Sequence, residues 1–168
     1  MNNDGWQDLI IIGFGRILVL TNEKGTLKTG VEVSSTVYAH SVLAHDFDHD
    51  GFQDIAVLGY ESSSTDATYS IYIFKNNGGT SYTLASKTKT FFTHLVMGDL
   101  NNDGFQDLLT LGYATSPKAE NTQILINRAN MKFEDQLIKI PICQNILVSD
   151  WNNDGLIDII GMSSQGIQ

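Results

Sequence analysis

The stretch Asp99–Leu109, with the sequence DLNNDGFQDLL, places four oxygen-bearing side chains within nine residues. They stand at positions one, three, five and nine. Position six is glycine, which can turn the backbone sharply because it has no Cβ. Carboxylates crowded in this way repel one another unless a cation lies among them. Ca²⁺ accepts several oxygen ligands in a flexible geometry, so the spacing predicts a calcium-binding loop.

The same pattern recurs along the chain. Asp46–Ile55 and Asp150–Ile159 repeat it in full, whereas Asn2–Ile10 repeats it without the aspartate of position one. Successive copies are separated by roughly 50 residues, a period in the range of propeller blades. A random distribution of acidic residues would not follow one template, so the loops indicate a repeat protein.

Composition excludes several classes of protein. The formal net charge of −9 argues against nucleic acid and anionic membrane surfaces as partners. With Cys143 as the single cysteine, the chain has no internal disulfide. No apolar run is long enough to span a bilayer, and no signal peptide is visible at Met1.

Apolar runs and turn residues predict an all-β fold. Four short strands per repeat, joined by short links, form an antiparallel meander. Inner strands such as Ile55–Leu58 are apolar without alternation, which indicates burial on both faces when one blade packs on the next. The predicted strands are 7–13, 16–21 and 26–34, then 41–45, 54–60, 68–75 and 81–89, then 95–100, 108–113, 122–127 and 132–138, and finally 145–149 and 157–162.

The predicted architecture is therefore a partial β-propeller over residues 1–168, an incomplete ring of about three to three and a half blades of four strands. Blade 1 covers about 1–37 and lacks its first strand; blade 2 covers about 38–91, blade 3 about 92–142, and the start of blade 4 about 143–168. Because the sequence begins and ends within a repeat, we expect either a fragment of a longer propeller or an assembly with other chains.

Two other calcium-loop families fit less well. An EF-hand loop requires a bidentate glutamate at position twelve. The three complete loops have Val57, Thr110 and Gly161 at that position, and their flanks are strand-like. Glycine-rich nonapeptide repeats are absent.

The pattern D-x-[DN]-x-D-G-x-x-D-[LI], placed between two apolar strands, resembles the FG-GAP repeats of integrin alpha-subunit propellers. The resemblance covers essentially the whole chain, and Phe14-Gly15 echoes the FG element. It implies that each loop joins the first two strands of a blade and holds one calcium ion. The implied side-chain ligands are Asp46, Asp48, Asp50 and Asp54; Asp99, Asn101, Asp103 and Asp107; and Asp150, Asn152, Asp154 and Asp158.

The resemblance also implies a backbone ligand in each loop. The carbonyls of Phe52, Phe105 and Leu156, at position seven, would complete the three full sites. The first loop keeps a partial set of Asn2, Asp4, Asp8 and the Trp6 carbonyl. We therefore expect Ca²⁺ in three complete loops, and a fourth, partial site that depends on a ligand from elsewhere. The alternative is a set of polar turns without metal, since Asn-Asp-Gly is a good turn sequence alone.

The sequence indicates the function of the protein less directly than its fold. Nothing resembles a nucleophile, a general base, a phosphate-binding loop or a zinc set, so the expectation is a non-enzymatic protein with structural calcium. The resemblance implies a protein-interaction or adhesion module on the extracellular or lumenal/periplasmic side. Its partner would be another protein, or the remaining blades from the same or another chain. The alternatives are a lectin-like propeller that binds glycans and a non-catalytic part of a polysaccharide-degrading enzyme.

Overall fold

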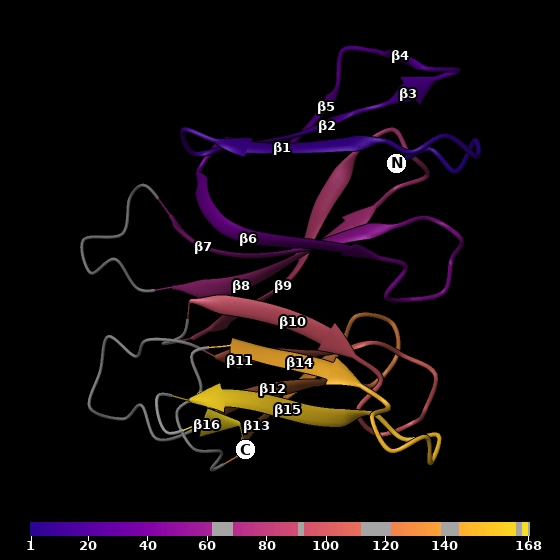
Figure 1. The fold of residues 1–168 in the computed structure, drawn as a ribbon. Helices are drawn as coiled ribbons and strands as arrows, with labels where there is room; N and C mark the ends of the chain where they lie inside the picture. The colour runs from indigo at the N-terminus through magenta and orange to yellow at the C-terminus, as the bar shows by residue number, and fades with distance from the viewer. Residues whose placement is uncertain (62–68, 91–92, 112–121, 139–144, 164–165, 168) are drawn as a thin grey trace. The chain divides into compact units, whose positions relative to one another are not determined.

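The computed structural model describes residues 1–61, 69–90, 93–111, 122–138, 145–163 and 166–167, and this part of the chain forms strands and turns without a helix (Figure 1). The chain divides into two compact units, Met1–Lys89 and Thr90–Gln168. Every strand pairing is antiparallel. No helix in the described part is long and apolar enough to cross a membrane.

The first sheet of unit 1 has three strands. β1 (Leu9–Gly13), β2 (Arg16–Leu20) and β5 (Val31–Ser34) lie in the order β1-β2-β5. Phe14 and Gly15 make the turn between β1 and β2, with φ of 50° and 74°. Two positive φ values in succession fit the right-handed twist of a tight hairpin.

A small separate hairpin follows β2. It consists of β3 (Asn22–Glu23) and β4 (Thr26–Leu27), so the single strand predicted over residues 26–34 is divided in two. The Asn22 side chain accepts a hydrogen bond from the backbone N–H of Gly25 at 2.8 Å and closes this hairpin. At Gly30 the chain passes so close to β2 that a Cβ would lie 2.0 Å from the Val19 carbonyl oxygen.

The second sheet of unit 1 is a complete four-stranded meander. β6 (Val37–His45), β7 (Asp54–Glu61), β8 (Ser70–Asn76) and β9 (Tyr82–Lys89) pair in chain order. β6 begins earlier than the predicted 41–45, because a bulge between Ala39 and Ser41 lets the pairing with β7 continue to Val37. β7 and β8 are buried over most of their length, as their continuous apolar sequences predict.

Unit 2 repeats this arrangement. β10 (His94–Gly98), β11 (Asp107–Leu111), β12 (Thr122–Asn127) and β13 (Phe133–Ile138) form a second complete four-stranded sheet. β14 (Asn145–Ser149), β15 (Asp158–Ser163) and β16 (Gly166–Ile167) form a three-stranded sheet. The strand predicted over residues 108–113 is described as far as Leu111, and its last two residues lie outside the described part of the chain.

Within each unit, neighbouring sheets pack face to face. In unit 1, Ile17 and Val19 of the first sheet share a core with Ile55, Val57 and Tyr72 of the second. In unit 2, Leu109, Ile124 and Ile126 pack against Ile146, Val148 and Ile159. Together with the two four-stranded meanders, this sheet-on-sheet packing confirms the predicted all-β fold of propeller-like blades.

Candidate metal centre

The three complete acidic loops occupy equivalent places in the fold. They join β6 to β7, β10 to β11 and β14 to β15, which are the first two strands of each sheet. The partial loop leads into β1. This placement is the one that the FG-GAP resemblance implies.

The backbone conformation is the same in all four loops. Position six is a glycine with φ between 85° and 92°, a left-handed conformation that favours a residue without a Cβ. Position four also has positive φ, from 57° to 66°. The position-six residues are Gly5, Gly51, Gly104 and Gly155, and the position-four residues are Asn3, His49, Asn102 and Asn153.

The aspartate at position one closes each complete loop through its backbone. Asp46 accepts hydrogen bonds from the N–H of Asp50 at 3.0 Å and of Gly51 at 2.8 Å, one on each carboxylate oxygen. Asp99 and Asp150 accept the equivalent pairs at 2.8–3.1 Å. Hydrogen bonds within the chain therefore bring positions one and five together without the help of a bound ion.

The aspartate at position five accepts the backbone N–H of position seven in every loop. The distance is 2.9 Å for Asp4, Asp50 and Asp103, and 2.8 Å for Asp154. This bond leaves the second carboxylate oxygen of position five to face position three. In the third and fourth loops Asn101 and Asn152 donate to that oxygen at 2.9 Å.

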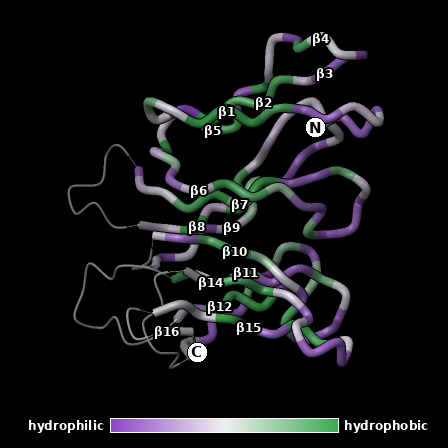
Figure 2. The backbone as a smooth tube through the Cα atoms, viewed as in Figure 1, coloured by the Kyte–Doolittle hydropathy of each residue, from purple (hydrophilic) through white to green (hydrophobic). Residues whose placement is uncertain are grey.

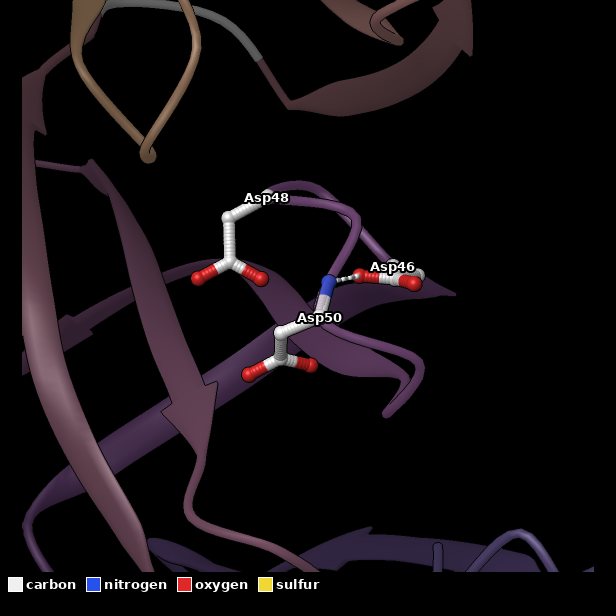
Figure 3. Close-up of side chains that lie close together, drawn as sticks. All are labelled: Asp46, Asp48 and Asp50. Carbon is white, nitrogen blue, oxygen red and sulfur yellow. Dashed lines mark hydrogen bonds between the residues drawn. The ribbon is translucent and has the colours of Figure 1, made fainter.

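In the second loop the three acidic side chains converge. One oxygen from each of Asp46, Asp48 and Asp50 lies within 4.8 Å of the other two (Figure 3). One of the two Asp48 oxygens, Oδ1, is buried without a hydrogen-bond partner. A buried carboxylate oxygen that lacks a donor is costly, so this atom is suited to coordinate a cation.

A lysine lies beside the second loop. Lys75, near the end of β8, places its ammonium group against the carboxylates of Asp48 and Asp50, with 2.7 Å between Nζ and Asp50 Oδ2. This pairing lowers the pKa of Asp50 and raises that of Lys75. The residue at the same place in the third loop, immediately before Asn127, is Ile126, so among the described residues the second loop alone of these two has a lysine ion pair.

The aspartate at position nine joins the loop to the sheet. Asp54 is fully buried and accepts the N–H of Phe47 at 3.1 Å and the N–H of Asn76, on β8, at 2.8 Å. Asp107 accepts the N–H of Leu100 at 2.9 Å and of Asn127, on β12, at 2.8 Å. In these two loops position nine therefore ties the start of the loop to the third strand, whereas Asp158 accepts the N–H of Trp151 at 3.0 Å and of Asn152 at 3.3 Å, both within its own loop. Asp54 does not belong to the converging group of Asp46, Asp48 and Asp50.

An asparagine completes this tie, and sequence reasoning did not anticipate it. The Asn76 side chain donates to the carbonyl of Gln53 at 3.0 Å and to that of Met1 at 2.8 Å. Asn127 donates to the Gln106 carbonyl at 3.4 Å. Gln53 and Gln106 are the residues immediately before position nine. The signal available in the sequence was therefore the recurring Gln-Asp pair, followed by an asparagine on the third strand.

The partial loop retains the same tie. Asp8 accepts the N–H of Asn2 at 3.1 Å and of Asn22 at 2.8 Å, and Asn22 donates to the Gln7 carbonyl at 3.0 Å. The Met1 ammonium group lies 3.6 Å from Asp8 Oδ2. Over the positions that the sequence covers, the loop is thus built like the others.

Burial opposes the charge of the position-nine carboxylates. For Asp54, burial raises the pKa to about 6, against the lowering effect of its two backbone hydrogen bonds. The negative charges of Asp48 and Asp50 raise it further. The pKa of Asp107 is also raised, again mainly by burial. Nearby positive charge would favour the ionised form of both groups.

Comparison with protein-family models matches residues 1–57 and 46–110 to the FG-GAP-like repeat. The chain belongs to the FG-GAP-like repeat family. Two overlapping matches agree with the spacing of the loops, and repeats of this family commonly bind calcium. Searches of the curated proteins and of the solved structures found no match.

The donors of these FG-GAP-like loops suit Ca²⁺ chemically. All are carboxylate or amide oxygens, the ligands that this hard cation prefers, and they lie on a turn whose backbone is already fixed. The position-seven carbonyls of Phe52, Phe105, Leu156 and Trp6 remain predicted ligands, as does the full set of side chains in each loop.

The raised pKa of Asp54 predicts that the chelator-treated protein loses stability as pH rises from about 4 to about 6. In this window the folded state binds more protons than the unfolded state, so the free energy of unfolding falls, by on the order of 2 kcal/mol. Denaturant unfolding at a series of pH values in chelator measures this slope.

Asp54→Asn is the matched control for this experiment. Asparagine cannot ionise, so the slope between pH 4 and pH 6 becomes shallower, although overall stability also falls because one of two acceptor oxygens is lost. An equal slope in both proteins would show that Asp54 is not the titrating group.

Proposed function

We propose that this chain is a calcium-binding β-propeller module for protein–protein interaction or adhesion, in which calcium has a structural role. The observation that carries the proposal is the acidic loop itself, built with one backbone geometry at equivalent places in three sheets. Bound calcium would supply the positive charge that the clustered carboxylates lack.

The residues that would hold the ion follow from the loop. Positions one, three and five converge in the second loop, and their equivalents are Asp99, Asn101 and Asp103 in the third loop. The position-nine aspartate stands between the loop and the third strand, so an ion beside it would stabilise the strand junction. This role requires neither a nucleophile nor a proton donor, and we propose no enzymatic activity.

Location and partners are inferred from the family. FG-GAP repeats are typically extracellular, where calcium is abundant enough to fill sites of modest affinity. An acidic module with formal net charge −9 is poorly suited to nucleic acid. We therefore propose a protein partner, including further blades, on the extracellular or lumenal/periplasmic side.

Asp103→Asn tests the metal site while it keeps the backbone hydrogen bond of position five, although the bond that Asn101 donates to the second oxygen is lost. The amide oxygen retains an acceptor for the Phe105 N–H, whereas the negative charge is lost. We expect loss of one bound calcium per chain in titration calorimetry and a smaller rise in melting temperature on adding calcium, with no large change in chelator. Unchanged calcium stoichiometry would contradict the role of this loop.

Lys75→Met should strengthen calcium binding at the second loop. The Lys75 ammonium group contacts two predicted ligands, so calcium binding there requires its displacement. Removing one positive charge at this distance is expected to raise affinity on the order of tenfold. Lys87→Met is the control, because Lys87 pairs with Glu61 instead. Equal calcium affinities of the Lys75→Met and wild-type proteins, measured by titration in competition with a chelator, would exclude such competition.

A glycan-binding function is the second candidate, and a cavity in unit 1 favours it. The cavity has a volume of about 530 Å³ and lies between the partial loop and the second sheet, lined by Trp6, Gln7, Gln53 and Asn3 among others. Trp6 is 48% exposed, so its ring is available for stacking on a sugar. Exposed aromatic rings with nearby amides are suited to polar ligands that have apolar faces.

Trp6→Ala tests this candidate on a glycan array. If the cavity binds sugar, wild-type protein binds a reproducible set of glycans and Trp6→Ala loses at least about fivefold in affinity, since a stacked aromatic contributes roughly 1 kcal/mol or more. Trp151→Ala is the control, because Trp151 is 74% exposed in the fourth loop. No glycan bound by the wild-type protein would rule the candidate out.

A further inference from the structure

One connection in unit 1 is longer than its equivalents. The chain passes from β2 to β5 over residues 21–30, whereas the corresponding connections from β8 to β9 and from β12 to β13 cover only 77–81 and 128–132. The extra length forms the hairpin β3–β4, whose tip is hydrophilic, in contrast to the largely hydrophobic β1 and β2 (Figure 2). Insertions into a single repeat often lie on the binding face of a repeat protein.

The hairpin is fixed against the partial acidic loop. The backbone N–H of Asn22 donates to the Asp8 carboxylate at 2.8 Å, and the Asn22 side chain donates to the Gln7 carbonyl at 3.0 Å. At the base of the hairpin, the N–H of Lys28 donates to the Thr21 carbonyl at 2.8 Å. The space between hairpin and loop therefore has a preformed shape, as is usual for small-molecule sites.

A cavity lies between the hairpin and the loop. Its volume is about 430 Å³, within the usual range for sites that bind small ligands. The Trp6 side chain, 48% exposed, supplies an aromatic ring, and the other lining residues are polar or charged. The full lining is Asp4, Trp6, Glu23, Lys24, Thr26 and Lys28.

Three of the four charged side chains in this cavity have partners. Lys28 Nζ lies 3.7 Å from Glu23 Oε2. The two Asp4 oxygens accept the Trp6 N–H and the Asn2 side chain, each at 2.9 Å. Within the described part of the chain, the Lys24 side chain makes neither an ion pair nor a hydrogen bond. The cavity therefore offers one free ammonium group, in a chain whose formal net charge is −9.

The backbone conformation of Lys24 is unusual for a lysine. The hairpin has a two-residue loop, Lys24-Gly25, with φ of 53° and 89°. Type I′ turns of this kind require positive φ at both residues, which Asn, Asp and Gly adopt most readily. The turn alone does not explain a lysine at the first position. Strained residues of this kind cluster at functional sites, and this one borders a cavity.

These features together suit a sugar that bears one carboxylate. The free ammonium group of Lys24 can pair with the carboxylate, and the exposed ring of Trp6 can stack on the apolar face of the sugar. Ionised carboxylates only accept hydrogen bonds, so Asp4 and Glu23 are suited to sugar hydroxyl groups. A nucleotide fits less well, because its phosphates bring several negative charges close to these two carboxylates.

We propose that the cavity between the partial loop and the hairpin β3–β4 binds an acidic sugar, a uronic or sialic acid, with the carboxylate on Lys24 and the ring on Trp6. The proposal deepens the glycan-binding candidate and rests on it, whereas the structural role of calcium is independent of it. The cavity beside Gln7 and Gln53 has no lysine or arginine among its lining residues. A preference for acidic over neutral sugars therefore distinguishes the two cavities.

Titration with monosaccharides, followed by the fluorescence of Trp6, tests this proposal. A Trp151→Phe background leaves Trp6 as the single tryptophan. Glucuronic acid and N-acetylneuraminic acid are the probes, and glucose is the neutral comparison. At least one acid is expected to bind on the order of tenfold more tightly than glucose, because the pair with the ammonium group is charge-assisted. The affinities of the two acids show which class is preferred.

Lys24→Met should weaken binding of the preferred acid on the order of tenfold and leave glucose binding unchanged. Lys132→Met is the matched control, because Lys132 is an exposed lysine in the equivalent connection of unit 2 and its loss changes the net charge equally. Circular dichroism verifies that both variants are folded.

Three outcomes overturn the proposal: equal affinities for the acids and glucose, no binding of either acid, or an equal effect of Lys132→Met. None of them decides the glycan-binding candidate, which the glycan array tests with Trp6→Ala. The proposed calcium role is likewise tested apart, by the calorimetry of Asp103→Asn.

Discussion

The two complete four-stranded sheets depend on one constraint: the carboxylate at position nine of their loops must remain inside the protein. Asp54 and Asp107 are fully buried, and each accepts one N–H from the loop and one from the third strand of its sheet. A buried carboxylate with too few donors would destabilise the fold. The two hydrogen bonds therefore fix the loop to the sheet, and the asparagine on the third strand secures the residue before it.

This tie explains why the loops can concentrate charge. The turn is held by backbone N–H groups that donate to positions one and five, so its shape does not require that the remaining oxygens be neutralised. Those oxygens can then converge at a cost in repulsion, which lysine offsets in the second loop. Similar backbone geometry with different local charge predicts that the loops differ in calcium affinity more than in shape.

Much of this fold could be predicted from sequence because its signals are local and repeated. The apolar runs gave the strands 122–127 and 145–149 with the observed bounds, and the glycine of each loop marked the turn before β7, β11 and β15. The hairpin β3–β4 could not be recognised, because it depends on a side chain of Asn22 that folds back on Gly25. The early start of β6 depends on a bulge, which no periodicity reveals.

The candidate site was less predictable for a related reason. Spacing along the chain identified the acidic residues, but it could not show that position nine is occupied by backbone donors from another strand, or that Lys75 approaches from β8. Both are tertiary contacts, between residues 22 to 27 positions apart in the sequence. A loop motif thus specifies which oxygens are offered, whereas the strand packed beside it determines how much negative charge is left for an ion. For that reason the residue before each third-strand asparagine, Lys75 in one sheet and Ile126 in another, sets the charge beside the acidic loop.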